Sequence, residues 1–297
     1  MLVRVLGSAA GGGFPQWNCG CPGCRAVREG ARPCRARTQS SIAVSGDHEQ
    51  WFLVNASPDV LTQIEHAGLT AGEGRATPVR AVLLTDAELD HVLGLPLLRE
   101  AESLELHCTG AVREALGEQG SGLLPLLQAY CPVTWREVRA GAEAALGGLV
   151  YRAFEAPTTK KARFGPQDAS DRVIGYRFTA PGSDAAVAYL PGAQEITEEV
   201  RAQLQDCAAV LVDGTCWRDD EMPQLGLGGK TAREMGHLPM SGPGGSLDRL
   251  AELPARTIYV HINNTNPVLL EDSPERREVE RRGFEIATDG AEVRIPP

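Results

Sequence analysis

Several features are scarce or missing in this chain of 297 residues, and each absence excludes a class of protein. No apolar run reaches the roughly 18 residues that a membrane-spanning helix needs. Residues 1–17 are too rich in glycine for a secretory signal, so we expect a cytoplasmic protein. Basic residues are also outnumbered, because the chain has 29 Lys and Arg but 39 Asp and Glu, which gives a formal net charge of −10. This balance argues against nucleic acid as the main partner.

Cysteine is too sparse for a disulfide scaffold, since the chain contains only eight. Five of them are scattered, and we expect these to pack as small apolar groups: Cys34, Cys108, Cys131, Cys207 and Cys216. The other three, Cys19, Cys21 and Cys24, form a C-x-C-x2-C motif within residues 18–25. Three thiolates in one tight loop predict a tetrahedral zinc site whose fourth ligand comes from far along the chain. The alternative is three loop cysteines without a metal.

Short β-rich runs alternate with helical patterns, which predicts an α/β fold. We expect strands at residues 2–7, 40–46, 51–57, 79–85, 104–108, 149–156, 173–180, 185–191, 208–214 and 256–263, with a last strand pair ending at Val293. We expect helices at residues 58–66, 94–101, 111–117, 196–207 and 274–282. Because strand runs come first in each half, the order predicts two mixed sheets packed face to face and flanked by helices. This αββα sandwich is expected to be one domain, residues 1–297.

A group of acidic side chains and one imidazole follows the buried strand at residues 79–84. It contains Asp86, Glu88, Asp90 and His91, all of which are common metal donors. The alternative is a polar helix start with Asp90 as its cap. Two later apolar strands also end in potential ligands, Asp213 and His261. We expect these strand-end residues to converge at one edge of a sheet, where they would form a metal site.

The strand-end residues resemble the ligands of the metallo-β-lactamase superfamily. Its H-x-H-x-D-H motif aligns with residues 86–91, and its later Asp and His align with Asp213 and His261. Longer segments are similar to the family of pyrroloquinoline quinone (PQQ) biosynthesis protein B: GSAAGGGFPQWNC (7–19), RTQSS (37–41), NASPD (55–59), LTDxxxDHxxGL (84–95), DGTxW (213–217), MGHLxxS (235–241) and HINNTNP (261–267). This resemblance implies a metallo-β-lactamase-like sandwich and a role in PQQ biosynthesis.

The sequence departs from the hydrolases of that superfamily in its ligands. Asp86 and Glu88 stand where two histidines are usual, and no histidine lies between His107 and His237. The first of the two usual metal sites has therefore lost its imidazoles. The second keeps Asp90, His91 and His261, with Asp213 nearby as a weak ligand or as a residue that orients a histidine. Two histidines and a carboxylate are the ligand set of mononuclear non-heme iron oxygenases.

The resemblance implies three candidate functions. One is an Fe(II)-dependent hydroxylase of a tyrosine-derived PQQ precursor. The others are a soluble carrier of PQQ or its precursor towards the periplasm, and a metallo-hydrolase. The implied partners are this small molecule and other PQQ biosynthesis proteins, and a homodimer is possible.

The same resemblance indicates two further candidate site residues. In related phosphodiesterases, a histidine three residues past the last strand-end histidine completes a similar zinc site, and Asn264 holds that position here. His237 stands where a superfamily histidine can act as an acid or base in the active site, at the expected start of a helix. The alternative is that His237 is hydrogen-bonded in the core of a loop.

Overall fold

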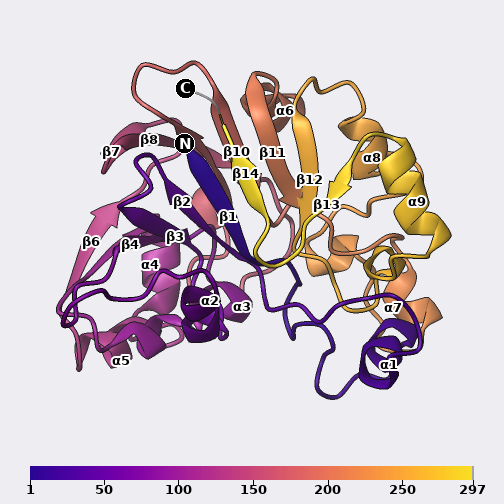
Figure 1. The fold of residues 1–297 in the computed structure, drawn as a ribbon, viewed down its shortest axis with the longest axis horizontal. Coiled ribbons are helices and arrows are strands. Elements are labelled where there is room, and N and C mark those ends of the chain that lie inside the picture. Colours follow the sequence, from indigo (N-terminus) through magenta and orange to yellow (C-terminus); the bar gives the residue numbers. More distant parts are fainter. Residues whose placement is uncertain (296–297) are drawn as a thin grey trace.

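The computed structural model describes residues 1–295, which form two mixed β-sheets with helices on both outer faces (Figure 1). This arrangement confirms the predicted αββα sandwich. The first sheet has the order β14-β1-β2-β3-β4-β5-β6. Its strands are β1 (Leu2–Gly7), β2 (Ser41–Ser45), β3 (Trp51–Val54), β4 (Val79–Leu83), β5 (Leu104–Cys108), β6 (Val133–Glu137) and β14 (Glu292–Arg294).

The second sheet has the order β13-β12-β11-β10-β9-β8-β7. Its strands are β7 (Glu143–Leu146), β8 (Leu149–Glu155), β9 (Ile174–Thr179), β10 (Ala186–Leu190), β11 (Cys207–Asp213), β12 (Arg256–Val260) and β13 (Glu285–Ile286). In each sheet the strands on one side pair in parallel and those on the other side pair antiparallel. The parallel halves are the halves that carry the predicted strand-end ligands.

Three apolar layers hold the sandwich together. The middle layer lies between the sheets and includes Val5, Tyr176 and Leu211. One outer layer covers the first sheet with α2 (Val60–His66), α3 (Leu89–Val92), α4 (Gly110–Leu116) and α5 (Leu123–Gln128). The other covers the second sheet with α6 (Glu198–Leu204), α8 (Ser246–Arg249) and α9 (Pro274–Arg281). The remaining helices, α1 (Pro22–Glu29) and α7 (Glu221–Gln224), lie near one end of the second sheet.

The strand-end ligands meet between the sheets rather than at one edge of a single sheet, which corrects our expectation. β11 and β12 are parallel neighbours, and Asp213 pairs with Val260, the residue before His261. β4, however, belongs to the first sheet, so the segment that carries Asp90 and His91 approaches from the opposite layer. The sandwich therefore brings the ligands together by stacking the carboxyl ends of parallel strands from both sheets.

Several local predictions were wrong. The last two strands do not pair with each other, because β13 joins β12 while β14 joins β1. The helix expected at residues 94–101 is only a 3-10 turn at Leu95–Leu98, where Pro96 lacks an amide donor. His237 does not open a helix but follows a 3-10 turn, Arg233–Met235. The sequence analysis also missed α1, α5, α7, α8, β6 and β7.

Helix α1 begins inside the cysteine motif. The Cys21 sulfur caps the helix by accepting the Cys24 amide at 3.4 Å, and Pro22 occupies the first helical position. The helix ends at Gly30, whose φ of 61° suits glycine. Helices α1 and α9 are each eight residues long. No helix within residues 1–295 is long and apolar enough to cross a membrane.

The fully buried Leu211 in the middle layer provides a test of this packing. Leu211→Ala should lower the free energy of unfolding by about 2–5 kcal/mol, because it leaves a cavity between the two sheets. Leu61→Ala is the matched control, since Leu61 is 53% exposed and its loss should change stability by less than about 0.5 kcal/mol. Urea unfolding followed by circular dichroism measures both values. Equal values for the two variants would contradict the assignment of Leu211 to the core.

Candidate metal centres

The first candidate centre begins in the turn after β4. Glu88 is the N-cap residue of α3, so Asp90 and His91 fall in the first turn of this short helix. Asp90 is therefore not the cap. The His91 ring is buried, and its Nδ1 lies 2.8 and 2.9 Å from the two carboxylate oxygens of Asp86. Asp86 also accepts the Glu88 amide at 2.9 Å, which fixes the carboxylate in the turn.

His261 faces this group from the second sheet. It follows β12 directly and has a φ of 52°, a backbone conformation that only a small share of non-glycine residues adopt. Its Nε2 lies 3.1 Å from Asp90 Oδ2, and the same oxygen lies 3.9 Å from His91 Nε2. Ligand atoms of Asp90, His91 and His261 all lie within 4.8 Å of one another, which is the spacing of a metal site.

The unpaired nitrogen of His91 is the clearest sign that a cation fits there. His91 Nε2 is buried and has no hydrogen-bond partner within residues 1–295. A buried polar atom without a partner is costly, and binding a metal removes that cost. Because Asp86 holds the opposite nitrogen, Nε2 is the atom available for coordination.

Charge favours a cation at the same position. Burial by itself would lower the pKa of His91, but the Asp86 and Asp90 carboxylates outweigh burial and raise that pKa to about 9. Burial would raise the pKa of Asp90, yet His91 and His261 hold it below its usual range. The two carboxylates therefore create a negative field around the imidazoles, and a divalent cation is stabilised by this field.

Asp213 and His237 lie on the other side of His261. Asp213 is buried, and one of its oxygens accepts the Thr215 hydroxyl at 2.6 Å. The other accepts the Ala193 amide at 2.9 Å and lies 2.6 Å from His237 Nδ1. Thr215 Oγ1 also lies 2.9 Å from His261 Nδ1. Both oxygens of Asp213 are thus held by protein donors.

His237 is part of a cavity wall rather than of a closed loop core. Its ring stacks on His261 with centroids 5.2 Å apart, and 16% of its side chain is exposed. Asp213, His237 and His261 form a second group whose ligand atoms lie within 4.8 Å. His261 therefore belongs to both groups, with Nε2 towards Asp90 and Nδ1 towards Thr215.

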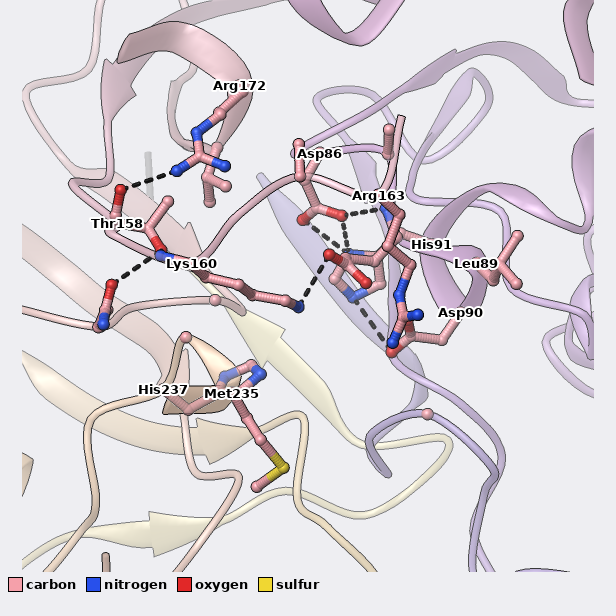
Figure 2. Close-up of a pocket in the computed structure, with 18 of the residues that line it drawn as sticks. Asp86, Leu89, Asp90, His91, Thr158, Lys160, Arg163, Arg172, Met235 and His237 are labelled. Atoms are coloured by element: carbon pink, nitrogen blue, oxygen red, sulfur yellow. Dashed lines mark hydrogen bonds and ion pairs between the residues drawn. The ribbon is translucent and has the colours of Figure 1, made fainter. Parts of the chain in front are cut away.

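A cavity of about 420 Å³ opens onto both groups. Asp86, Asp90, His91, His237 and His261 line it. Asp213 does not line the cavity, although its carboxylate lies within 4.8 Å of the His237 and His261 nitrogens. Lys160, Arg163 and Arg172, all on the segment between β8 and β9, also line the cavity, and Figure 2 shows Lys160 and Arg172 on the side away from His91. The sequence analysis missed this part of the lining, although the run KKAR at residues 160–163 was a signal for it. It also missed Thr215, which follows Asp213 by two residues.

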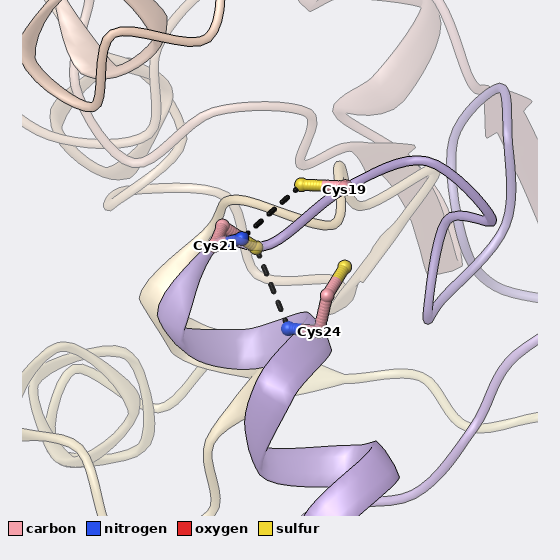
Figure 3. Close-up of side chains that lie close together, drawn as sticks. All are labelled: Cys19, Cys21 and Cys24. Carbon is pink, nitrogen blue, oxygen red and sulfur yellow. Dashed lines mark hydrogen bonds between the residues drawn. The ribbon is translucent and has the colours of Figure 1, made fainter.

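The second candidate centre is the cysteine cluster. The buried sulfurs of Cys19, Cys21 and Cys24 lie within 4.8 Å of one another (Figure 3). Each sulfur accepts a backbone amide at 3.4 Å, from Cys21, Cys24 and Gln16 respectively. Burial raises the pKa of Cys21 to about 12, so its thiol stays protonated unless a cation displaces the proton.

Asn264 closes the cluster from 240 residues away in sequence. Its side-chain NH2 group donates to the Cys19 sulfur at 3.0 Å and to the Cys24 sulfur at 3.3 Å. The Cys21 thiol lies 3.2 Å from the Asn264 backbone carbonyl. The three sulfurs are the soft ligands that a tetrahedral zinc ion prefers, and the Asn264 amide lies where a fourth ligand would approach them.

Comparison with known proteins identifies the family of this chain. The family model "Beta-lactamase superfamily domain" matches residues 50–262. Over 98% of both chains, the sequence is 48% identical to Coenzyme PQQ synthesis protein B of Azoarcus sp. (strain BH72). The crystal structure of Zn(2+)-bound PqqB from Methylobacterium extorquens superimposes with a TM-score of 0.92 at 39% identity, covering 99% of this chain and 100% of that one.

A more distant structure shares the fold alone. A diphosphatase from the PhnP family has a TM-score of 0.71 and 20% identity, and the match covers 99% of this chain and 98% of that chain. The full-length sequence matches and the strand-end ligand pattern lead to one family. The chain belongs to the family of Coenzyme PQQ synthesis protein B, within the beta-lactamase superfamily.

Proposed function

We propose that this protein acts in PQQ biosynthesis as a mononuclear Fe(II)-dependent hydroxylase of a tyrosine-derived precursor. One observation carries the proposal: two imidazoles and one carboxylate face one another at a cavity, and each imidazole has its Nδ1 held by another side chain. This is the arrangement by which proteins fix metal-binding histidines. The ligands His91, His261 and Asp90 match the 2-His-1-carboxylate set of non-heme iron oxygenases.

Fe(II) bound by these residues would supply oxygen activation for hydroxylation of a phenol ring. The chain's own residues would position and deprotonate the substrate. Asp213 holds His237 Nδ1 at 2.6 Å, which leaves Nε2 as the nitrogen that can take a proton from a phenol hydroxyl. Asp213 itself acts as a positioning residue, because its oxygens are already engaged by Ala193, Thr215 and His237.

The two alternative functions receive less support from the ligands. A hydrolase of this fold uses a pair of metals to activate water, but Asp86 is hydrogen-bonded to His91 and Glu88 pairs with Lys160 at 2.8 Å. Neither residue replaces the missing histidines as a free ligand. A carrier would need the cavity but not the three converging ligands, so metal-dependent oxygen consumption separates a carrier from a hydroxylase.

We also propose that the cysteine cluster binds a structural zinc ion through Cys19, Cys21 and Cys24. The relative from Methylobacterium extorquens is described as Zn(2+)-bound, which supports zinc as a metal of this family. Asn264 would provide the fourth ligand through Oδ1, the amide atom that can coordinate a metal, once the amide turns over from the orientation in which its NH2 group donates to the three sulfurs.

The iron proposal is tested by anaerobic Fe(II) titration followed by oxygen uptake with a tyrosine-like diol. His91→Ala and His261→Ala should abolish Fe(II) binding and oxygen uptake, because each removes one of only two imidazole ligands. Glu88→Ala is the matched control and should keep iron bound, since Glu88 contacts Lys160 rather than the ligand group. Loss of iron from Glu88→Ala as complete as from His91→Ala would contradict the assignment. Equal oxygen uptake by metal-free protein would remove the enzyme proposal.

The effect of Asp86→Ala on Fe(II) binding should lie between those of His91→Ala and Glu88→Ala. Asp86→Ala should weaken Fe(II) binding by about 10–100-fold without abolishing it, because His91 keeps its ligand nitrogen but loses the carboxylate that orients it. The dissociation constant from the same anaerobic titration measures this loss. Unchanged affinity would show that Asp86 does not position His91 for metal binding.

The zinc proposal is tested by metal analysis of purified variants. Cys21→Ser should lose zinc, because one of three sulfur ligands is replaced by a weakly binding hydroxyl. Cys34→Ser is the control, since Cys34 lies outside the cluster and should leave the zinc content at one ion per chain. A Cys21→Ser protein that retains full zinc would refute the assignment.

A further inference from the structure

One tryptophan stands almost entirely in solvent. The Trp17 side chain is 86% exposed, which is more than any other large apolar side chain in residues 1–295. The other three tryptophans of the chain, Trp51, Trp135 and Trp217, are buried or half-buried. An exposed indole forgoes a large free energy of burial, and tryptophan is among the residues that contribute most to protein interfaces.

The loop that carries Trp17 is held in place on both sides of the indole. The Gln16 amide donates to the Cys24 sulfur at 3.4 Å, and the Gln16 side chain donates to Asn18 Oδ1 at 2.8 Å. The Cys19 amide donates to the Gln16 carbonyl at 3.1 Å. Trp17 is therefore presented by a fixed backbone, and a contact made by a preorganised side chain costs little conformational entropy.

Two arginines of α1 lie against the same loop. Arg25 donates to the Gly20 carbonyl, and Arg28 donates to the carbonyls of Gln16 and Cys19, so the guanidinium groups flank the residue between them, Trp17. Both arginines are exposed, and neither forms an ion pair with a carboxylate of residues 1–295. Because a guanidinium has five N–H donors, each of the two keeps donors free for a ligand.

The charge of this segment is opposite to that of the chain. Residues 11–36 contain four arginines and one glutamate, a formal charge of +3, whereas the whole chain carries −10. Arg32 and Arg35 are already paired with Asp272 and Glu271. The positive charge that remains is concentrated at the two arginines beside the indole, and such a charge attracts an anionic partner.

We propose that Trp17, Arg25 and Arg28 form a docking site for a short acidic segment of another protein. Two carboxylates of that segment bind the guanidinium groups, and an apolar side chain between them packs on the indole. A long polyanion such as nucleic acid is disfavoured, because beyond the two arginines it meets Glu29 and the negative field of the remaining chain.

The site is accessible to a large partner. Figure 1 shows α1 and the loop before it at the periphery of the molecule, away from the layers of the sandwich. The same loop begins at Gly11, which lines the cavity of about 420 Å³. A partner docked at Trp17 thus contacts the loop that forms part of the cavity wall. The inference goes beyond the proposed function and does not depend on iron or on hydroxylation.

The test is fluorescence anisotropy of a fluorescein-labelled peptide, EEEFEEE, titrated with the full chain. Arg25→Gln/Arg28→Gln should raise the dissociation constant about tenfold, the combined effect of two partly exposed ion pairs. Trp17→Ala leaves the arginine contacts with the loop intact and should raise the constant about fivefold, because the phenyl ring loses its aromatic partner. Circular dichroism checks that each variant is folded.

Two matched controls separate the site from general properties of the surface. Arg80→Gln/Arg152→Gln removes the same charge from exposed positions elsewhere, and Tyr130→Ala removes another aromatic side chain, which is 68% exposed. Each should change the dissociation constant by less than about twofold. If both arginine double variants weaken binding equally, the effect is one of net charge and the proposal is overturned.

The choice of probe distinguishes the occupants. The peptide EEEAEEE should bind more weakly than EEEFEEE, and equal binding would contradict the role of the indole. Tighter binding of a ten-residue oligothymidylate or of phosphatidylglycerol vesicles would assign the site to another class of anion and overturn the proposal. Self-association of the chain that Trp17→Ala abolishes in sedimentation velocity would identify a second copy as the occupant, which also contradicts it.

Discussion

The segment from His261 to Asn266 is the constraint on which both candidate centres depend. His261 supplies an imidazole to the cavity group, and Asn264, three residues later, faces the three cysteine sulfurs. The segment is held by backbone hydrogen bonds from Ile262 to Ser8 and from Asn263 to Thr215, both 2.9 Å long. Asn266 adds a side-chain bond to the Gly214 carbonyl at 2.9 Å. These contacts offset the cost of the positive φ at His261.

The cysteine cluster and the cavity group are connected through this segment. The cluster joins the N-terminal loop and α1 to the segment after β12, which are more than 200 residues apart in sequence. Fixing one end of a short, strained segment also restricts the other end.

The electrostatics of the cavity divide into two regions. Carboxylates surround the imidazoles at the ends of β4 and β11, where they favour a cation. Ammonium and guanidinium groups occupy the β8–β9 segment across the cavity, where they favour an anion. Lys160 lies at the boundary and pairs with Glu88. The two sides of the cavity therefore carry fields of opposite sign.

The sequence by itself determined the local chemistry of this protein. Strand periodicity gave the two-sheet sandwich, and the tight spacing of Cys19, Cys21 and Cys24 gave the sulfur cluster, because both patterns act over a few residues. The candidate ligands Asp90, His91 and His261 were also evident, since each follows an apolar strand. Tertiary structure alone decided that β4 faces β11 and β12 from the other sheet, that Thr215 and Asp86 hold the imidazoles, and that the lysines of the β8–β9 segment meet the ligands. These contacts join residues far apart in the chain, and their positions are set by how the sheets pack rather than by any local pattern.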